Sequence, residues 1–302
     1  MAAIVSRFFM CIFLLFLTPH ALCHTLTMKD PVVTTAPFEF FNNFRSSRKG
    51  DSCEGLHQVK KYLYQFGYLN TLDAKNKDLF DDTLESAIKT YQLNHNLDIT
   101  GFLDSRTVSK MMMPRCGVSD IINGTNTMYR GTNPLNASQF TLFPSRRKWP
   151  ETLLTYRFLS GFPQSFMEPI RYAFEIWSNK TSFFFFKLRD DLDEEYSDLQ
   201  IAFVNGEHGD GYPFDGPGGV LSHAFQPTDG RMHFDASEDW IVGSLPRTID
   251  IVSVALHEIG HLLGLGHTNI PDAIMYPNIR YAMVKRTLHQ DDIDGIRTLY
   301  GS

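Results

Sequence analysis

Three histidines and a glutamate stand together near residue 260, in the order His-Glu-Ile-Gly-His-Leu-Leu-Gly-Leu-Gly-His. Helical residues four apart lie on one face, so His257 and His261 project together. Gly264 supplies the backbone freedom for a sharp turn, after which His267 returns to the same place. Three imidazoles and one open position form the ligand set of a catalytic zinc. Glu258 lies beside them as the candidate general base for a water.

A second group of possible metal ligands lies upstream, between residues 208 and 238. Imidazoles with one carboxylate suit a closed structural zinc, and here they are His208, Asp210, His223 and His233. Hard oxygens suit Ca²⁺. The candidate oxygen ligands are Asp215, Gly216, Gly218, Val220, Asp235 and Glu238. A polar loop without ions is the alternative, but two adjacent clusters with distinct ligand chemistry favour two zinc ions and at least one calcium.

The first residues predict export. Arg7 precedes an apolar run at residues 8–17, and a small-residue exit follows, which is typical of a cleavable signal peptide over residues 1–23. The run is too short to span a membrane comfortably, so no membrane anchor is expected. The mature chain should be secreted into the extracellular space. Sequons for N-glycosylation occur at Asn123, Asn136 and Asn179.

The 302 residues carry a net charge of −6, with 43% hydrophobic and 21% charged residues. This composition is typical of a soluble protein of two domains, and it argues against nucleic acid as a partner. Apolar residues at helical spacing predict three helices, at residues 54–68, 82–95 and 104–112. Asn, Thr and Gly then predict a linker at residues 122–140.

An α+β pattern follows the linker. Alternating and helical periodicities predict strands at residues 153–159, 182–188, 199–204, 220–225 and 232–234, and helices at residues 164–178, 249–263 and 288–300. The phenylalanine run at residues 183–186 is most simply a buried strand.

Two cysteines remain outside the signal region, Cys53 and Cys116. An oxidising compartment allows a disulfide between them. The other possibility is that Cys116 is a thiolate reserved for the metal. It lies in Pro-Arg-Cys-Gly-Val-Ser-Asp, an extended segment that a helix cannot absorb, where Arg115 and Asp120 are spaced to pair and to present the sulfur. Zinc coordination requires a free thiol, so the two interpretations exclude each other.

The sequence resembles the matrix metalloproteinases, or matrixins, over residues 50–302, and the plant branch in particular. The resemblance rests on the zinc helix, on the Met-turn-like Ile-Met-Tyr-Pro at residues 274–277, and on residues 114–120, 208–219 and 233–240. It implies a metzincin (zincin) catalytic domain at residues 141–302, with a five-stranded mixed sheet and three helices. A three-helix propeptide, residues 24–121, similar to peptidoglycan-binding modules, precedes it. No haemopexin-like domain is expected.

The resemblance implies a monomeric zinc endopeptidase, made as a latent zymogen, that hydrolyses extracellular or cell-wall proteins in the apoplast. Cys116, in a cysteine switch at residues 114–120, holds the catalytic zinc until the chain is cut within residues 122–140. Substrate then lies along the edge strand 220–225, with a pocket wall at residues 277–281.

Two residues depart from the family pattern. Arg231 stands where the family usually has an Asp that serves a second calcium together with a residue like Asp198, and this leaves that calcium open. Ser119 replaces a usual Pro without changing the chemistry of Cys116. A rival function is an inactive extracellular binding protein that recognises glycan or protein through residues 50–113. The intact Glu258 and three histidines argue against it.

Overall fold

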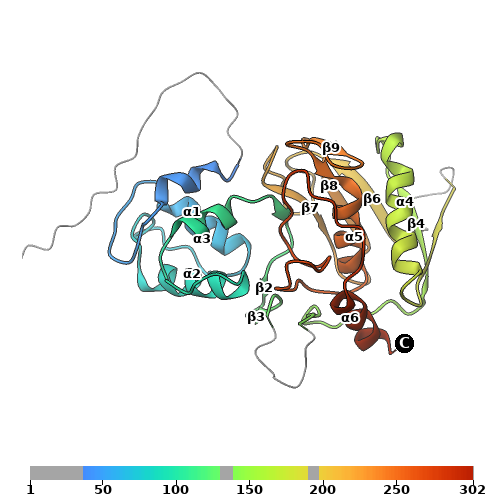
Figure 1. Cartoon of the computed structure of the whole chain (residues 1–302), viewed down its shortest axis with the longest axis horizontal. Coiled ribbons are helices and arrows are strands. Elements are labelled where there is room, and N and C mark those ends of the chain that lie inside the picture. Colours follow the sequence, from blue (N-terminus) through green and yellow to red (C-terminus); the bar gives the residue numbers. More distant parts are fainter. Residues whose placement is uncertain (1–36, 130–138, 190–196, 302) are drawn as a thin grey trace, which may run out of the picture.

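The computed structural model describes residues 37–129, 139–189 and 197–301. They form a helical lobe (residues 37–112) beside a larger lobe built on a sheet (residues 139–301), as Figure 1 shows. Residues 114–120, here called the switch segment, run between the two lobes. The predicted signal peptide and Asn136 lie outside the described residues.

Three α-helices build the helical lobe: α1 (Leu56–Gln65), α2 (Asp82–Asn94) and α3 (Ser105–Met111). Their apolar faces meet in one core, and the side chains of Asp81 and Asp104 cap α2 and α3 by accepting from backbone N–H groups. The three predicted helices are thus confirmed. A 3₁₀ helix, η1 (Glu39–Phe44), was not predicted; its Phe41 and Phe44 complete the same core.

The predicted linker begins with regular structure. Strands β2 (Ile121–Ile122) and β3 (Thr125–Asn126) form an antiparallel hairpin. Asn123 and Gly124 make its turn with φ values of 49° and 76°, in the left-handed region that Asn and Gly tolerate best. The predicted linker at residues 122–140 therefore begins within a hairpin, and its residues 130–138 lie outside the described residues.

In the described part of the larger lobe, five strands form the sheet, in the order β7-β8-β6-β4-β5. They are β4 (Leu153–Phe158), β5 (Phe184–Lys187), β6 (Leu199–Val204), β7 (Val220–Ala224) and β8 (Arg231–Asp235). Only the β7–β8 pair among them is antiparallel, so the predicted mixed sheet is confirmed.

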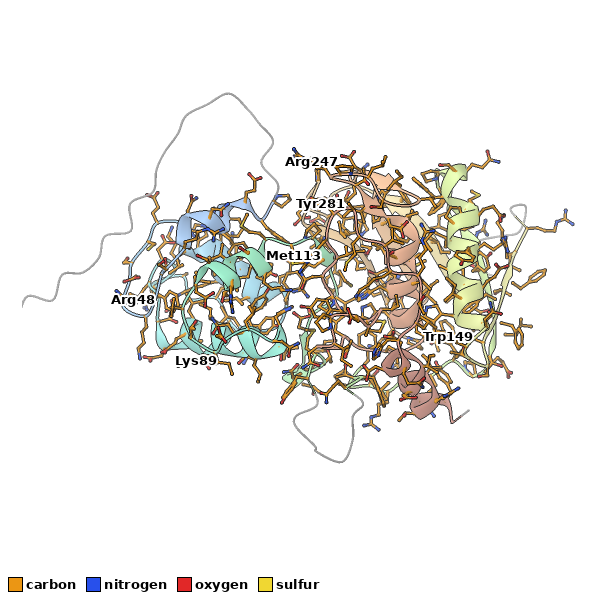
Figure 2. The ribbon with its side chains drawn as sticks, in the orientation of Figure 1. Arg48, Lys89, Met113, Trp149, Arg247 and Tyr281 are labelled. Carbon is orange, nitrogen blue, oxygen red and sulfur yellow. The ribbon has the colours of Figure 1, made fainter. Side chains whose placement is uncertain are left out.

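The helices of this lobe are α4 (Gln164–Ser178), α5 (Ile251–Leu262) and α6 (Gln290–Tyr300). Helix α4 packs along α5, and both contact the sheet (Figure 1). A short parallel pair, β9 (Trp240–Ile241) and β10 (Ile249–Asp250), leads into α5. Trp149, labelled in Figure 2, donates from Nε1 to the carbonyl of Leu262 at 2.7 Å and so satisfies the last turn of α5.

The phenylalanine run is not a fully buried strand. Strand β5 is an edge strand, and Phe184 and Phe186 are 62% and 63% exposed. Phe183 and Phe185 point the other way, into the core. Because strand side chains alternate, an edge strand with only one covered face leaves every second residue in solvent.

A sixth strand joins the sheet from the switch segment. Strand β1 (Arg115–Cys116) pairs in parallel with β7, which places Cys116 opposite Ser222. On its other side, Cys116 N donates to Pro277 O at 2.9 Å and Ile279 N donates to Pro114 O at 3.1 Å. The switch segment thus fills the space between the edge of the sheet and the chain after the Met-turn.

Candidate active site

Helix α5 carries the first two histidines and is buried along its whole length. Asp250 caps it by accepting from Ser253 N, and Arg286 holds the Asp250 carboxylate in place. After the helix ends, Gly264 turns the chain at a φ of 100°. A Cβ atom on Gly260 would lie 2.2 Å from Met275 Sδ, so a glycine there lets the Met-turn pack directly against the helix.

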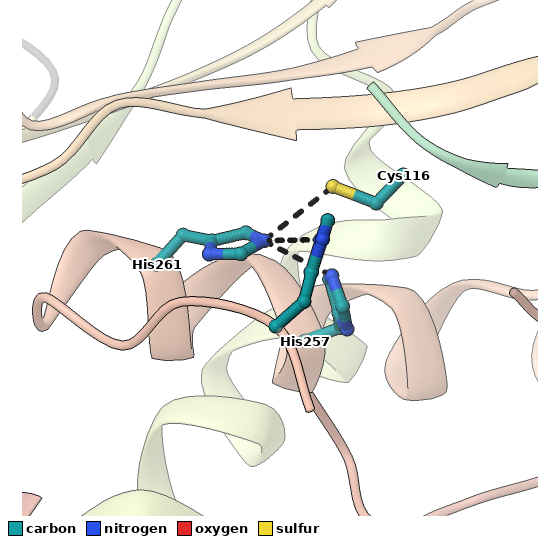
Figure 3. Close-up of side chains that lie close together, drawn as sticks. Cys116, His257 and His261 are labelled. Carbon is teal, nitrogen blue, oxygen red and sulfur yellow. Dashed lines mark hydrogen bonds between the residues drawn. The ribbon is translucent and has the colours of Figure 1, made fainter. Parts of the chain in front are cut away.

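The three histidines and Cys116 converge on one point, as Figure 3 shows for Cys116, His257 and His261. His261 Nε2 lies 3.1 Å from His257 Nε2, 3.2 Å from His267 Nε2 and 3.5 Å from Cys116 Sγ. Ligands at zinc-bond lengths of 2.0–2.3 Å in a tetrahedron stand about 3.3–3.6 Å apart. The spacing therefore fits a four-coordinate zinc.

The hydrogen bonds of the rings fix their protonation. His257 Nδ1 lies 2.7 Å from Ile274 O and His261 Nδ1 lies 2.8 Å from Leu265 O. Carbonyl oxygens only accept, so Nδ1 carries the proton in both rings. Burial also lowers the pKa of both rings well below the ordinary value, which keeps them neutral. Their Nε2 lone pairs then face one another, an arrangement that a cation between them relieves.

Glu258 is fully buried beside these rings. Its Oε1 accepts from Ser222 Oγ at 2.6 Å, while its Oε2 has no hydrogen-bond partner among the described residues. Burial raises the pKa of Glu258 to about 7. A carboxylate with one oxygen held and the other unengaged is suited to take up a proton. Sequence reasoning missed Ser222, which no local pattern links to the glutamate.

Cys53 and Cys116 are both buried and no disulfide joins them, so the pairing of these two cysteines is wrong. The predicted ion pair is present instead: Arg115 donates from Nη2 to Asp120 Oδ1 at 2.8 Å and from Nη1 to Oδ2 at 3.0 Å. A Cβ atom on Gly117 would lie 2.7 Å from Val220 Cγ1, so a glycine is needed where the segment passes β7. The pair and the glycine together hold the sulfur toward the histidines.

A cavity of about 20 Å³ lies beside Cys116 and Glu258, room for about one water. Of the predicted pocket wall at residues 277–281, Pro277, Asn278 and Ile279 line this cavity.

The second predicted zinc group also converges. Asp210 Oδ2 lies 2.8 Å from His208 Nε2, 2.7 Å from His223 Nε2 and 2.9 Å from His233 Nδ1. The carboxylate oxygen and the three ring nitrogens stand as four separate ligand atoms within 4.8 Å of one another, which matches a closed four-ligand set.

The candidate calcium ligands lie near one another, but their oxygen atoms are more widely spaced than the ligand atoms of the two histidine groups. Within the described residues, the two histidine groups are the ones whose ligand atoms gather within 4.8 Å. Glu238 Oε1 accepts from Gly218 N at 2.6 Å, and Asp235 Oδ2 is buried without a partner. Burial, with the charges of Asp235 and Asp215, raises the pKa of Glu238 to about 8. Buried carboxylates that repel one another are chemically suited to a hard cation.

The residues discussed for a second calcium have other partners. Arg231 makes a two-pronged pair with Asp229, at 2.7 and 2.8 Å, and stacks on Phe225. Asp198 Oδ2 accepts from Thr155 N at 2.7 Å and from Thr155 Oγ1 at 2.6 Å. Asp198 is thereby engaged in holding β4.

Comparison with known proteins decides the family. The matrixin profile matches residues 148–301, just over half of the chain. The chain is a matrixin. A second profile, described as a putative peptidoglycan binding domain, matches residues 54–111, which include the three helices of the helical lobe.

The relatives of this matrixin include plant and animal enzymes. Metalloendoproteinase 2-MMP of Arabidopsis thaliana is 41% identical over 295 residues, covering 89% of this chain and 77% of the relative. Metalloendoproteinase 1 of Glycine max is 45% identical, with 85% and 86% covered. Matrilysin of Homo sapiens is 36% identical, with 81% and 85% covered. This matrixin is accordingly a zinc metalloendopeptidase that acts on protein substrates.

Two of the three N-glycosylation sequons lie in the described residues. Asn123 and Asn179 are exposed. No helix among the described residues has the length and apolar character needed to cross a membrane.

Proposed function

We propose that this matrixin is a secreted endopeptidase made as a latent zymogen, with Cys116 as the inhibitory zinc ligand and Glu258 as the general base. The observation that carries the proposal is the place of Cys116 Sγ, 3.5 Å from His261 Nε2 and at the fourth corner of the histidine group. An inactive binding protein would have no need of a buried carboxylate with one unbonded oxygen beside three metal-binding rings.

The residues divide the chemistry between them. His257, His261 and His267 would hold a zinc ion, which would supply a Lewis acid for the scissile carbonyl and would make a bound water more acidic. Glu258 takes the proton on the oxygen that Ser222 leaves free and later delivers it to the leaving amine. The Nδ1 hydrogen bonds of His257 and His261 keep both rings in the tautomer that offers Nε2 to the metal.

Substrate would take the place of the switch segment. An extended peptide can add to the edge of β7 through main-chain hydrogen bonds. Gly117 N already donates to Ser222 O at 2.8 Å and Arg115 N donates to Gly219 O at 3.0 Å, so those acceptors are occupied in the latent chain. Latency therefore blocks both the metal and the strand edge, and a cut within residues 122–140 releases them.

The proposed setting is extracellular, in the apoplast or cell wall, with glycans on the exposed sequons and a monomeric chain. The predicted signal peptide and the plant relatives support this setting.

A fluorogenic peptide assay tests the activity. The chain cut within residues 122–140 should hydrolyse a peptide, lose the activity to a zinc chelator and regain it with added zinc. The uncut chain should show little turnover. A cut, zinc-replete chain that binds peptide or glycan without hydrolysing it would support the rival binding function instead.

Metal content is a further prediction. We expect two zinc ions and at least one calcium in each folded chain. Asp210→Asn should remove one zinc, because Asp210 Oδ2 lies within 2.9 Å of a ring nitrogen of all three histidines in the second group. Removal of calcium should lower the melting temperature, because the ion binds only the folded state. Elemental analysis and calorimetry check this. One zinc in fully active wild type would contradict the structural site, and an unchanged melting temperature would contradict the calcium.

A further inference from the structure

Asp120 of the switch segment contacts a zinc-ligand candidate as well as Arg115. Its Oδ1 lies 2.8 Å from His267 Nδ1, and both side chains are fully buried. The Nδ1 partners of His257 and His261 are the carbonyls of Ile274 and Leu265, which belong to the larger lobe itself. Of the three histidines, only His267 has its Nδ1 hydrogen bond to a residue, Asp120, that leaves with the propeptide.

The carboxylate is held rigidly as an anion. Arg115 donates to both of its oxygens and Tyr68 donates from its hydroxyl to Oδ2 at 2.8 Å. An ionised carboxylate only accepts hydrogen bonds, so the His267 proton must sit on Nδ1 and Nε2 must be bare.

We propose that Asp120 is an outer-sphere partner of the catalytic zinc that is present only in the latent chain, where it orients His267 and strengthens it as a ligand. This inference rests on the proposed zymogen function. A carboxylate on the far nitrogen of a ligating histidine fixes its tautomer and raises its basicity, and loss of such a partner weakens metal binding about 10–100-fold.

Activation therefore changes the metal site twice. Removal of the switch segment takes Cys116 from the fourth position and also takes the Asp120 carboxylate from the third histidine. The latent chain should therefore bind its catalytic metal more tightly than the activated chain does. The difference in affinity should exceed what the Cys116 thiolate alone contributes. Asp120 is a positioning residue here, since it acts through His267.

The test uses the full-length chain with Glu258→Ala, which prevents self-cleavage, loaded with Co²⁺. The charge-transfer band of a thiolate on cobalt reports the catalytic site alone, because the second cluster contains no cysteine. The rate at which a chelator removes this band is compared for the parent, Asp120→Asn and Tyr68→Phe. Tyr68→Phe is the matched control: it removes another hydrogen bond to Asp120 and leaves the bond to His267.

Asp120→Asn should show the thiolate band and lose it about 10–100-fold faster than the parent, with Tyr68→Phe close to the parent. Equal rates for Asp120→Asn and Tyr68→Phe would overturn the inference. Absence of the band from the parent would instead overturn the proposed role of Cys116, so the two failures are distinct.

A second measurement needs no change at Asp120. In ¹⁵N-labelled zinc protein, the Nδ1 proton of His267 should resonate downfield in the full-length Glu258→Ala chain, as expected of an imidazole bound to a carboxylate. It should move upfield when the linker is cut and the propeptide removed, while the Nδ1 protons of His257 and His261 stay in place. Three Nδ1 protons that respond equally, or not at all, would refute the role of Asp120.

Discussion

Replacing Glu258 with alanine in the activated chain should lower kcat on the order of 10²–10⁴-fold, the usual contribution of a general base, at unchanged zinc content. The substitution leaves the three histidines in place, and His257 and His261 keep their Nδ1 bonds to Ile274 O and Leu265 O, so the metal stays bound. The water then lacks its proton acceptor, and the leaving amine lacks its donor.

Two further variants show whether the loss is chemical. Glu258→Gln keeps the size of the side chain and should be nearly as inactive as Glu258→Ala. Ser222→Ala removes only the 2.6 Å hydrogen bond to Oε1 and should have a much smaller effect on kcat. The zinc content of each sample shows whether a lower kcat comes from the missing base or from missing metal. Near-normal turnover in a zinc-replete Glu258→Ala enzyme would mean that another group is the base.

Much of the fold could be predicted because the relevant signals are local. The helices of the helical lobe show apolar spacing within one segment, and Asp81 and Asp104 stand where an N-cap belongs. The hairpin after the switch segment was also readable, since Asn123-Gly124 is a strong turn signal that the general Asn and Gly content obscured. The phenylalanine run was misread because apolar content alone does not show which strand lies at an edge.

The rest depends on contacts between distant residues. Strand β1 has two residues, and nothing but its pairing with β7 and the chain after the Met-turn makes it a strand. The zinc histidines could be found from their spacing, yet their partners could not. Asp120 and His267 are 147 residues apart, and Ser222 and Glu258 are 36 apart. The first pair forms only when the two lobes have folded and met, and the second forms only when α5 packs against β7.

The largest change in latency should come from Cys116→Ser. A thiolate binds zinc far better than a hydroxyl that keeps its proton, so the serine chain loses its hold on the fourth position. Uncut Cys116→Ser should therefore hydrolyse a fluorogenic peptide, or cut itself within residues 122–140 without an added protease. An activity assay on the freshly purified chain checks whether the uncut chain is active. Its mass, followed over time, checks whether it cuts itself.

Cys53→Ser is the matched control, because Cys53 is a buried cysteine like Cys116 but belongs to the core of the helical lobe. It should remain latent. A thiol-modifying mercurial should activate wild type and Cys53→Ser, and it should find no thiol at position 116 in Cys116→Ser. If Cys116→Ser is as latent as wild type, the hydrogen bonds of the switch segment to Ser222 and Pro277 suffice to close the site, and the sulfur is not the inhibitor.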